Sequence, residues 1–182
     1  LASSGQNQLY KKSLYDKING FDKIKNLLQG DDSIFLQICK KKLNPKISFS
    51  IDKDSHVNAK THSSWKNLIL QRMRWAGDAN IMWKYNKIFF IIILSTFLTN
   101  LFLLFIPTYL LISLKYIKIF SILFLIKFLL EFSIYYFGNH KLNHQMYIYS
   151  FIFWYIFQIP YVVLMGFLSF FTHKISWKDR GA

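Results

Sequence analysis

The sequence predicts an α/β domain that is followed by an all-α membrane bundle. Charge is unevenly distributed: residues 1–87 hold 16 Lys or Arg and 7 Asp, whereas residues 88–182 hold only 7 basic and 2 acidic side chains. The first part combines helical patterns with an alternating segment, and the second contains three long apolar segments. We therefore divide the chain into a soluble, basic part (1–87), a membrane part (88–172) and a basic tail (173–182).

Two helices are predicted near the start of the basic part. Residues 11–18 form a short helical pattern that ends at Asn19-Gly20, a frequent helix C-cap. Asp31 or Ser33 can cap a second helix, because short polar side chains accept hydrogen bonds from the first turn. That helix ends in a run of lysines, which suits the negative end of the helix dipole.

The α/β assignment depends on the next segment. Ile47, Phe49 and Ile51 alternate with polar residues, which is the period of a half-buried strand. Residues 56–60 predict a second, shorter strand. A third helix then begins after Ser63-Ser64, because serine is a favoured N-cap residue.

This third helix carries the sequence NLILQRMRWAGD. Gln71, Arg74, Trp75 and Asp78 are spaced i, i+3, i+4 and i+7, so they share one helix face. The planar fork of an arginine suits a diphosphate, a tryptophan offers a flat surface to a sugar or base, and a glutamine donates and accepts without charge. The alternative interpretation is an amphipathic helix at a membrane surface, with arginine and tryptophan as interface anchors.

Asp31 and Asp32 form a second candidate constellation. Two neighbouring carboxylates repel each other, which suits a general base that takes up a proton near neutral pH. The alternative is that the pair only caps the helix that follows.

The membrane part contains three apolar segments, at residues 88–114, 119–137 and 146–171. The first is free of charge and long enough to span a bilayer, and Pro107 is expected to kink or end its helix. The second contains Lys127 and Glu131, which lie four apart on one helix face and are expected to pair. The third is rich in aromatic residues, as interfacial belts are.

The amino-acid composition indicates which molecules the chain binds and in which compartment it folds. A net charge of +14 attracts polyanions, but basic residues beside apolar segments are typical of the cytoplasmic flanks of membrane helices. No nucleic-acid-binding module accompanies the charge, so we expect a lipid bilayer and no nucleic acid as partner.

The single cysteine, Cys39, excludes an internal disulfide framework and fits a reducing compartment. We expect it to be a small, partly buried filler on a helix. The chain starts at Leu1 without a signal peptide, and we expect it to be part of a longer protein.

The order of these motifs resembles a known family. GDD followed by QRMRW and then apolar segments is similar to the end of the catalytic domain in membrane-bound glycosyltransferases of family 2, which have a GT-A type fold and include cellulose, chitin and hyaluronan synthases. The stretch SSGQNQLYKKSLYDKINGFD resembles the region ahead of the acidic pair in that family, and WKDR at the end is similar to the tail of many bacterial members. The resemblance covers nearly the whole chain and implies a partial GT-A type domain.

The resemblance also implies roles for individual residues. Asp32 would be the general base that deprotonates an acceptor hydroxyl for an inverting attack on the sugar. Gln71 and Arg74 would hold the departing nucleotide diphosphate, Trp75 would shape the acceptor end of the cleft, and Asp31 would contribute to substrate binding. The implied partners are a nucleotide-sugar donor and a sugar or lipid-linked acceptor, in polysaccharide or glycolipid synthesis.

A divalent metal ion, Mg²⁺ or Mn²⁺, is expected from the resemblance, but its ligands are not assigned to this chain. The acidic motifs that bind the base and the metal upstream in the family have no counterpart here. Asp52-Lys53-Asp54 follows the acidic pair and is therefore out of order, so we interpret it as a solvated turn.

The expected location is the inner (cytoplasmic) membrane, with several membrane passes and the catalytic part in the cytoplasm. The positive-inside tendency then favours an arrangement in which residues 88–114 dip in and return or lie along the inner face, so that Lys115, Lys118 and the basic tail stay inside. The alternative to an enzyme is a non-enzymatic basic membrane anchor or assembly protein, whose arginine and tryptophan only grip lipid headgroups.

Overall fold

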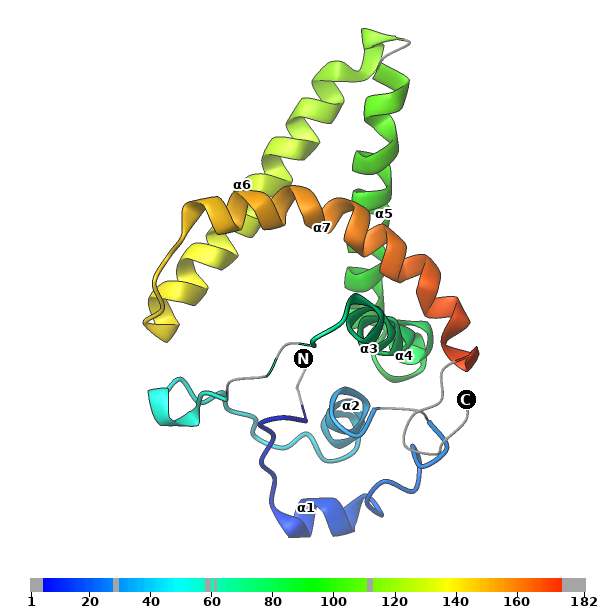
Figure 1. Ribbon diagram of the computed structural model, residues 1–182. Coiled ribbons are helices and arrows are strands. Elements are labelled where there is room, and N and C mark those ends of the chain that lie inside the picture. Colours follow the sequence, from blue (N-terminus) through cyan, green and yellow to red (C-terminus); the bar gives the residue numbers. More distant parts are fainter. Residues whose placement is uncertain (1–4, 28–29, 58–59, 61, 111–112, 175–182) are drawn as a thin grey trace. The chain divides into compact units, whose positions relative to one another are not determined.

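The computed structural model describes residues 5–27, 30–57, 60, 62–110 and 113–174 (Figure 1). Its α-helices are α1 (Lys12–Lys17), α2 (Ser33–Leu43), α3 (Trp65–Gly77), α4 (Ala79–Tyr85), α5 (Lys87–Leu110), α6 (Ile117–Leu142) and α7 (Ile148–Leu168). Short 3₁₀ helices are η1 (Lys53–Ser55), η2 (Leu114–Tyr116) and η3 (Ser169–Lys174). The helices that the sequence predicts within residues 1–87 correspond to α1, α2 and α3.

The α/β prediction is wrong, because the described residues contain no strand. The alternating side chains of Ile47, Phe49 and Ile51 are 39%, 78% and 53% exposed, and their backbone is irregular. The second predicted strand, 56–60, is irregular where it is described, and residues 58–59 lie outside the described part. A strand needs a neighbour that pairs its backbone groups and covers one face. In the described residues this segment joins no sheet and its alternating side chains stay exposed, so the alternation does not produce a strand.

The chain divides into two units. Unit 1 comprises Leu1–Ser50, Ser55–Leu94 and Met165–Ala182, and unit 2 comprises Ile51–Asp54 and Ser95–Leu164. Helices α5 and α7 contribute residues to both units.

The core of unit 1 forms around α2, which packs against α4. Its buried side chains are Ile18, Ile24, Ile34, Phe35, Ile38, Cys39 and Met82. Phe21 packs edge-on against Phe35, with 5.1 Å between ring centroids. Cys39 is 2% exposed on α2, which confirms its predicted role as a small filler.

Polar side chains fix the starts of three helices in unit 1. Asp32, and not Asp31 or Ser33, provides the side-chain cap of α2. Ser64 Oγ accepts a hydrogen bond from the Asn67 backbone at 3.3 Å to cap α3, as predicted. Asn86 Oδ1 accepts from the Phe89 backbone at 2.9 Å, in the first turn of α5. The Asn86 side-chain amide also donates to Gln37 Oε1 at 2.9 Å, so the same residue ties the start of α5 to α2.

Unit 2 is held by a polar and aromatic contact between α6 and α7. Lys127 and Glu131 form the predicted ion pair, with 2.8 Å between Nζ and Oε1. The Lys127 ammonium also lies 4.4 Å from the centre of the buried Tyr155 ring. Gln158 donates to the second carboxylate oxygen of Glu131, and the Tyr155 hydroxyl donates to the Phe124 carbonyl at 2.7 Å.

Two helices in the described part of the chain are long and apolar enough to cross a membrane: Lys87–Leu110 and Ile148–Thr172. They correspond to the first and third predicted apolar segments, and the second lies in α6. Pro107 neither ends α5 nor turns it back, because the helix continues to Leu110. A return at Pro107 is therefore not seen in the described residues, and a position of α5 along the inner face stays a prediction.

Candidate active site

Helix α3 carries Gln71, Arg74 and Trp75, which the sequence predicts to share a binding face. The capped start at Ser64 allows the helix to run without a break to Gly77. Met73 and Arg74 are buried, Gln71 is half-buried, and Trp75 is 46% exposed. The residues of the predicted face therefore differ in their surroundings, with Arg74 on the packed side of the helix.

Arg74 is a buried cation with acidic neighbours. Only 9% of the residue is exposed. Burial lowers the pKa of the guanidinium, while the negative charges of Asp31 and Asp78 act in the opposite direction. An arginine keeps its proton under these conditions, because the guanidinium is too basic to lose it in a protein. The result is a permanent positive charge that is partly withdrawn from water.

The Asp32 carboxylate is fixed by backbone groups on both of its oxygens. Oδ1 accepts from the Ser33 backbone N–H, and Oδ2 accepts from the Gly5 backbone N–H at 3.0 Å. The first bond is the helix cap that the alternative interpretation of the acidic pair predicts. An ionised carboxylate has about four lone-pair sites, so the two bonds orient Asp32 and leave capacity to accept a further proton. Capping and proton abstraction are therefore compatible at this residue.

Asp31 connects the acidic pair to the arginine. It is exposed at the start of α2, and its charge acts on the Arg74 guanidinium. Residues from two helices that are well separated in sequence thus come within electrostatic range of one another inside unit 1. The pair Asp31-Asp32 and the cation Arg74 form the candidate site.

Trp75 makes a different contact. The guanidinium carbon of Arg72 lies 4.5 Å from the centre of the Trp75 ring, a distance typical of cation–π stacking. Arg72 is half-buried, and the two side chains together form an exposed patch on α3. The two arginines of the motif therefore have different surroundings: Arg74 has acidic neighbours, and Arg72 lies over an indole ring.

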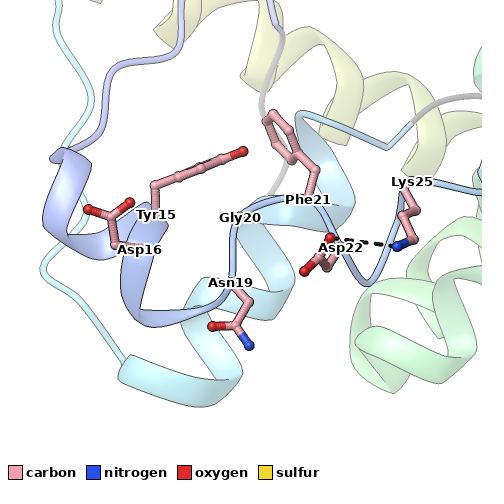
Figure 2. Close-up of a pocket in the computed structure, with 7 residues that line it drawn as sticks. All are labelled: Tyr15, Asp16, Asn19, Gly20, Phe21, Asp22 and Lys25. Carbon is pink, nitrogen blue, oxygen red and sulfur yellow. Dashed lines mark ion pairs between the residues drawn. The ribbon is translucent and has the colours of Figure 1, made fainter.

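A surface pocket of about 450 Å³ lies beside α1 and does not include the candidate site (Figure 2). Its lining residues are Tyr15, Asp16, Asn19, Gly20, Phe21, Asp22 and Lys25. Lys25 and Asp22 form an exposed ion pair at 3.7 Å at its edge. Gly20-Phe21-Asp22 belongs to the stretch that resembles the glycosyltransferases, but this open pocket lacks the acidic pair and the arginines, so we assign it no chemical role.

The described residues contain no group of three or more His, Cys, Asp or Glu side chains that could hold a metal ion. Asp52 and Asp54 are exposed around the short helix η1, in keeping with a solvated turn. The WKDR sequence at residues 177–180 lies outside the described residues.

Sequence reasoning missed three residues near α3 that connect distant elements of unit 1. Gly77 and Asn80 contact η3, and Asn86 joins α2 to α5. An asparagine directly before an apolar helix is a recognisable N-cap signal, so Asn86 could have been predicted to cap the apolar helix from the sequence alone. Nothing in the sequence indicates that Gly77 and Asn80 meet a segment close to the other end of the chain.

The chain is similar to one known protein family along nearly its whole length. The model of a protein family, glycosyl transferase family 21, matches residues 2–181. Comparisons with curated proteins and with solved structures found no match. The predicted resemblance to glycosyltransferases is confirmed at this level, although the motifs had suggested family 2. The match covers the acidic pair, α3 and the apolar helices alike.

Proposed function

Because this chain belongs to glycosyl transferase family 21, we propose that it is part of a membrane enzyme that transfers a sugar from a nucleotide-sugar to an acceptor hydroxyl. In this proposal the chain provides the general base and the side chains that bind the leaving diphosphate, which we call the diphosphate clamp. Asp32 is the general base in this proposal. Arg74 and Gln71 hold the leaving diphosphate, Trp75 contributes to the acceptor end, and Asp31 contributes to substrate binding.

The observation that carries the proposal is the position of Arg74. It is buried on α3, and the charge of Asp31, directly before Asp32, acts on it. A sugar transfer needs a base for the acceptor on one side of the sugar and a positive charge for the leaving group on the other. Unit 1 supplies both from the start of α2 and from α3.

The proposed reaction is a single displacement. Asp32 takes the proton of the acceptor hydroxyl, and the hydroxyl oxygen forms a bond to the anomeric carbon. The bond from that carbon to the diphosphate oxygen breaks on the opposite face, and its electron pair leaves with the nucleoside diphosphate. The configuration at the anomeric carbon is therefore inverted.

The clamp acts at the moment when negative charge develops. An arginine fork donates two parallel hydrogen bonds to phosphate oxygens, and a partly desolvated cation stabilises the departing charge more strongly than one in water. Removal of one such preorganised donor typically costs a factor of about 10² to 10³ in rate. The expected divalent metal would neutralise the diphosphate further, but the described residues offer no cluster for it, and this proposal assigns it no step.

The proposed location is a membrane, with residues 1–87 in the cytoplasm, where nucleotide-sugars are made. The two helices that could span a bilayer support membrane association, and the basic residues of the first part suit the cytoplasmic side. A membrane enzyme of this kind can pass sugars to lipid-linked or polysaccharide acceptors.

Transfer itself can be tested in membranes from cells that express the natural protein. Radiolabelled UDP-glucose, UDP-galactose, UDP-N-acetylglucosamine and GDP-mannose are supplied in turn with Mg²⁺ or Mn²⁺. We expect one donor to label a product with the anomeric configuration opposite to that of the donor, as determined by NMR. Absence of transfer from every donor would favour the non-enzymatic membrane anchor, and a retained configuration would exclude Asp32 as the base of a single displacement.

A further inference from the structure

The end of α3 is held by η3, the short helix that follows α7. Helix η3 packs against both α3 and α4, and all three elements belong to unit 1 in their described parts. The contact joins the helix that carries Arg74 to a segment near the other end of the chain.

Gly77 lets the two backbones approach. A Cβ atom at this position would lie 2.7 Å from Cγ2 of Thr172 and 3.4 Å from its Cβ and Oγ1. Carbon atoms normally pack at about 3.5–4.0 Å, so a methyl group at position 77 would require a shift of about 1 Å. A threonine side chain is stiff about χ1, which limits local relief. Glycine is a poor helix former, and its place in the last turn of α3 is explained by this contact.

Asn80 adds a polar contact to the same interface. Its side-chain amide donates to the Ser169 carbonyl at 2.9 Å. Ser169 is 3% exposed, and its hydroxyl donates to the Gly166 carbonyl at 2.6 Å and lies 3.4 Å from Asn80 Oδ1. Ser169 therefore ties the start of η3 to α4, and Thr172 packs against Gly77 of α3.

Arg74 lies one helical turn before Gly77, so a shift of the glycine moves the arginine with it. We propose that Gly77 and Asn80 are positioning residues that hold the last turn of α3 against η3 and so keep Arg74 aligned with the leaving diphosphate. The inference rests on the proposed role of Arg74. It adds that the end of α7 sets the alignment of the clamp.

The test is a second-site rescue in the natural protein, purified in detergent and assayed with the nucleotide-sugar donor that it uses. The variants are Gly77→Ala, Thr172→Ala and the double variant. Gly138→Ala is the matched control, because a Cβ at Gly138 meets nothing within 4 Å. A displacement of about 1 Å at a reacting group can cost about 10²-fold in rate. We expect Gly77→Ala to lower kcat at least about tenfold, and Thr172→Ala to restore most of the loss in the double variant.

The kinetic pattern separates positioning from general damage. A clamp that acts on the transition state changes kcat and leaves the KM for the donor nearly unchanged. Thr172→Ala alone and Gly138→Ala should remain within about twofold of the natural protein. A Gly77→Ala variant with normal kcat, or a loss that Thr172→Ala does not relieve, would overturn the inference.

If Gly77→Ala does not accumulate as folded protein, Asn80→Leu decides the question. This variant keeps the approximate size of the side chain and removes the donor to Ser169. A folded Asn80→Leu protein with lowered kcat and an unchanged KM supports the inference, and one with unchanged kcat contradicts it. Arg74→Lys is measured beside it: a normal rate there would reject the proposed function, whereas a low rate there with normal Gly77 and Asn80 variants would reject only the inference.

Discussion

Arg74 and Arg72 lie two positions apart on the same helix, but they have different surroundings. Arg74 is buried and interacts with the charges of Asp31 and Asp78, whereas Arg72 lies over the ring of the exposed Trp75. In the proposed function Arg74 binds the leaving diphosphate, whereas Arg72 stacks on an indole ring. The motif therefore contains two arginines with separable roles.

Substitution by lysine should distinguish these roles. Arg74→Lys replaces a planar fork by a point charge, so we expect kcat/KM to fall by about 10²-fold. Arg72→Lys should stay within about threefold, because a lysine can still lie over an indole ring. Steady-state kinetics of both variants provide the measurement. Equal losses would indicate a general effect of positive charge.

Cys39 gives a second prediction for a single residue. Burial raises the pKa of the thiol, and only the thiolate reacts with a maleimide. The residue is 2% exposed, so we expect slow labelling in the folded protein and rapid labelling after denaturation. Lys66→Cys in a Cys39→Ser background is the exposed control. Labelling of Cys39 as fast as that of the control would contradict the packing of α2.

At the scale of elements, the contact between α6 and α7 explains how an apolar helix can carry two charges. Lys127 is 7% exposed and has Glu131 as ion partner, the ring of Tyr155 beside it, and Gln158 bonded to the same carboxylate. Charged groups in apolar surroundings are tolerated when they are paired and hydrogen-bonded. The two helices are therefore expected to be stable as a pair.

Removal of one charge should cost more than removal of both. Glu131→Leu leaves the Lys127 ammonium without its partner, and we expect a loss of about 3 kcal/mol in the free energy of unfolding. The double variant Lys127→Met, Glu131→Leu should recover most of this loss, because an apolar pair needs no compensation. Unfolding of the purified proteins in detergent provides the comparison. A double variant as unstable as the single one would show that the pair does more than neutralise charge.

At the scale of the whole molecule, the packing of η3 on α3 constrains the membrane topology. If the chain spans a membrane, the contact of η3 with α3 requires the end of α7 to lie on the same side as α3, so the number of crossings between them is even. A continuous α5 and the apolar helix Ile148–Thr172 meet this condition if both cross and α6 does not. Crossing by α6 and α7 also meets it.

Cysteine labelling in intact cells tests this constraint. In the Cys39→Ser background, we expect Lys178→Cys to react with an impermeant maleimide only after the membrane is opened. Lys141→Cys should react from outside, and Lys115→Cys does so only if α5 crosses. Labelling of position 178 in intact cells would mean an odd number of crossings and would contradict the packing of η3 on α3.

The features that the sequence predicted correctly are local ones. The cap at Ser64 and the pair Lys127–Glu131 involve residues within one helical turn, so residue type and spacing are sufficient. The cap of α2 was predicted at Asp31 or Ser33 and lies at Asp32, between them. The strand at residues 47–51 failed because alternation indicates a possible face and cannot supply the neighbouring strand. The contact of Gly77 with Thr172 joins distant segments, and a single sequence contains no signal for it.

The most direct test of the proposed transfer site is the variant Asp32→Asn in the natural protein. The amide keeps the size of the side chain and loses the ability to take a proton, so we expect sugar transfer to disappear while binding of the nucleotide-sugar remains within about twofold. Transfer is measured with the radiolabelled donor, and binding by equilibrium dialysis of the same donor without acceptor. Near-normal transfer by Asp32→Asn would contradict the assignment of the base, and with it the site formed by α2 and α3.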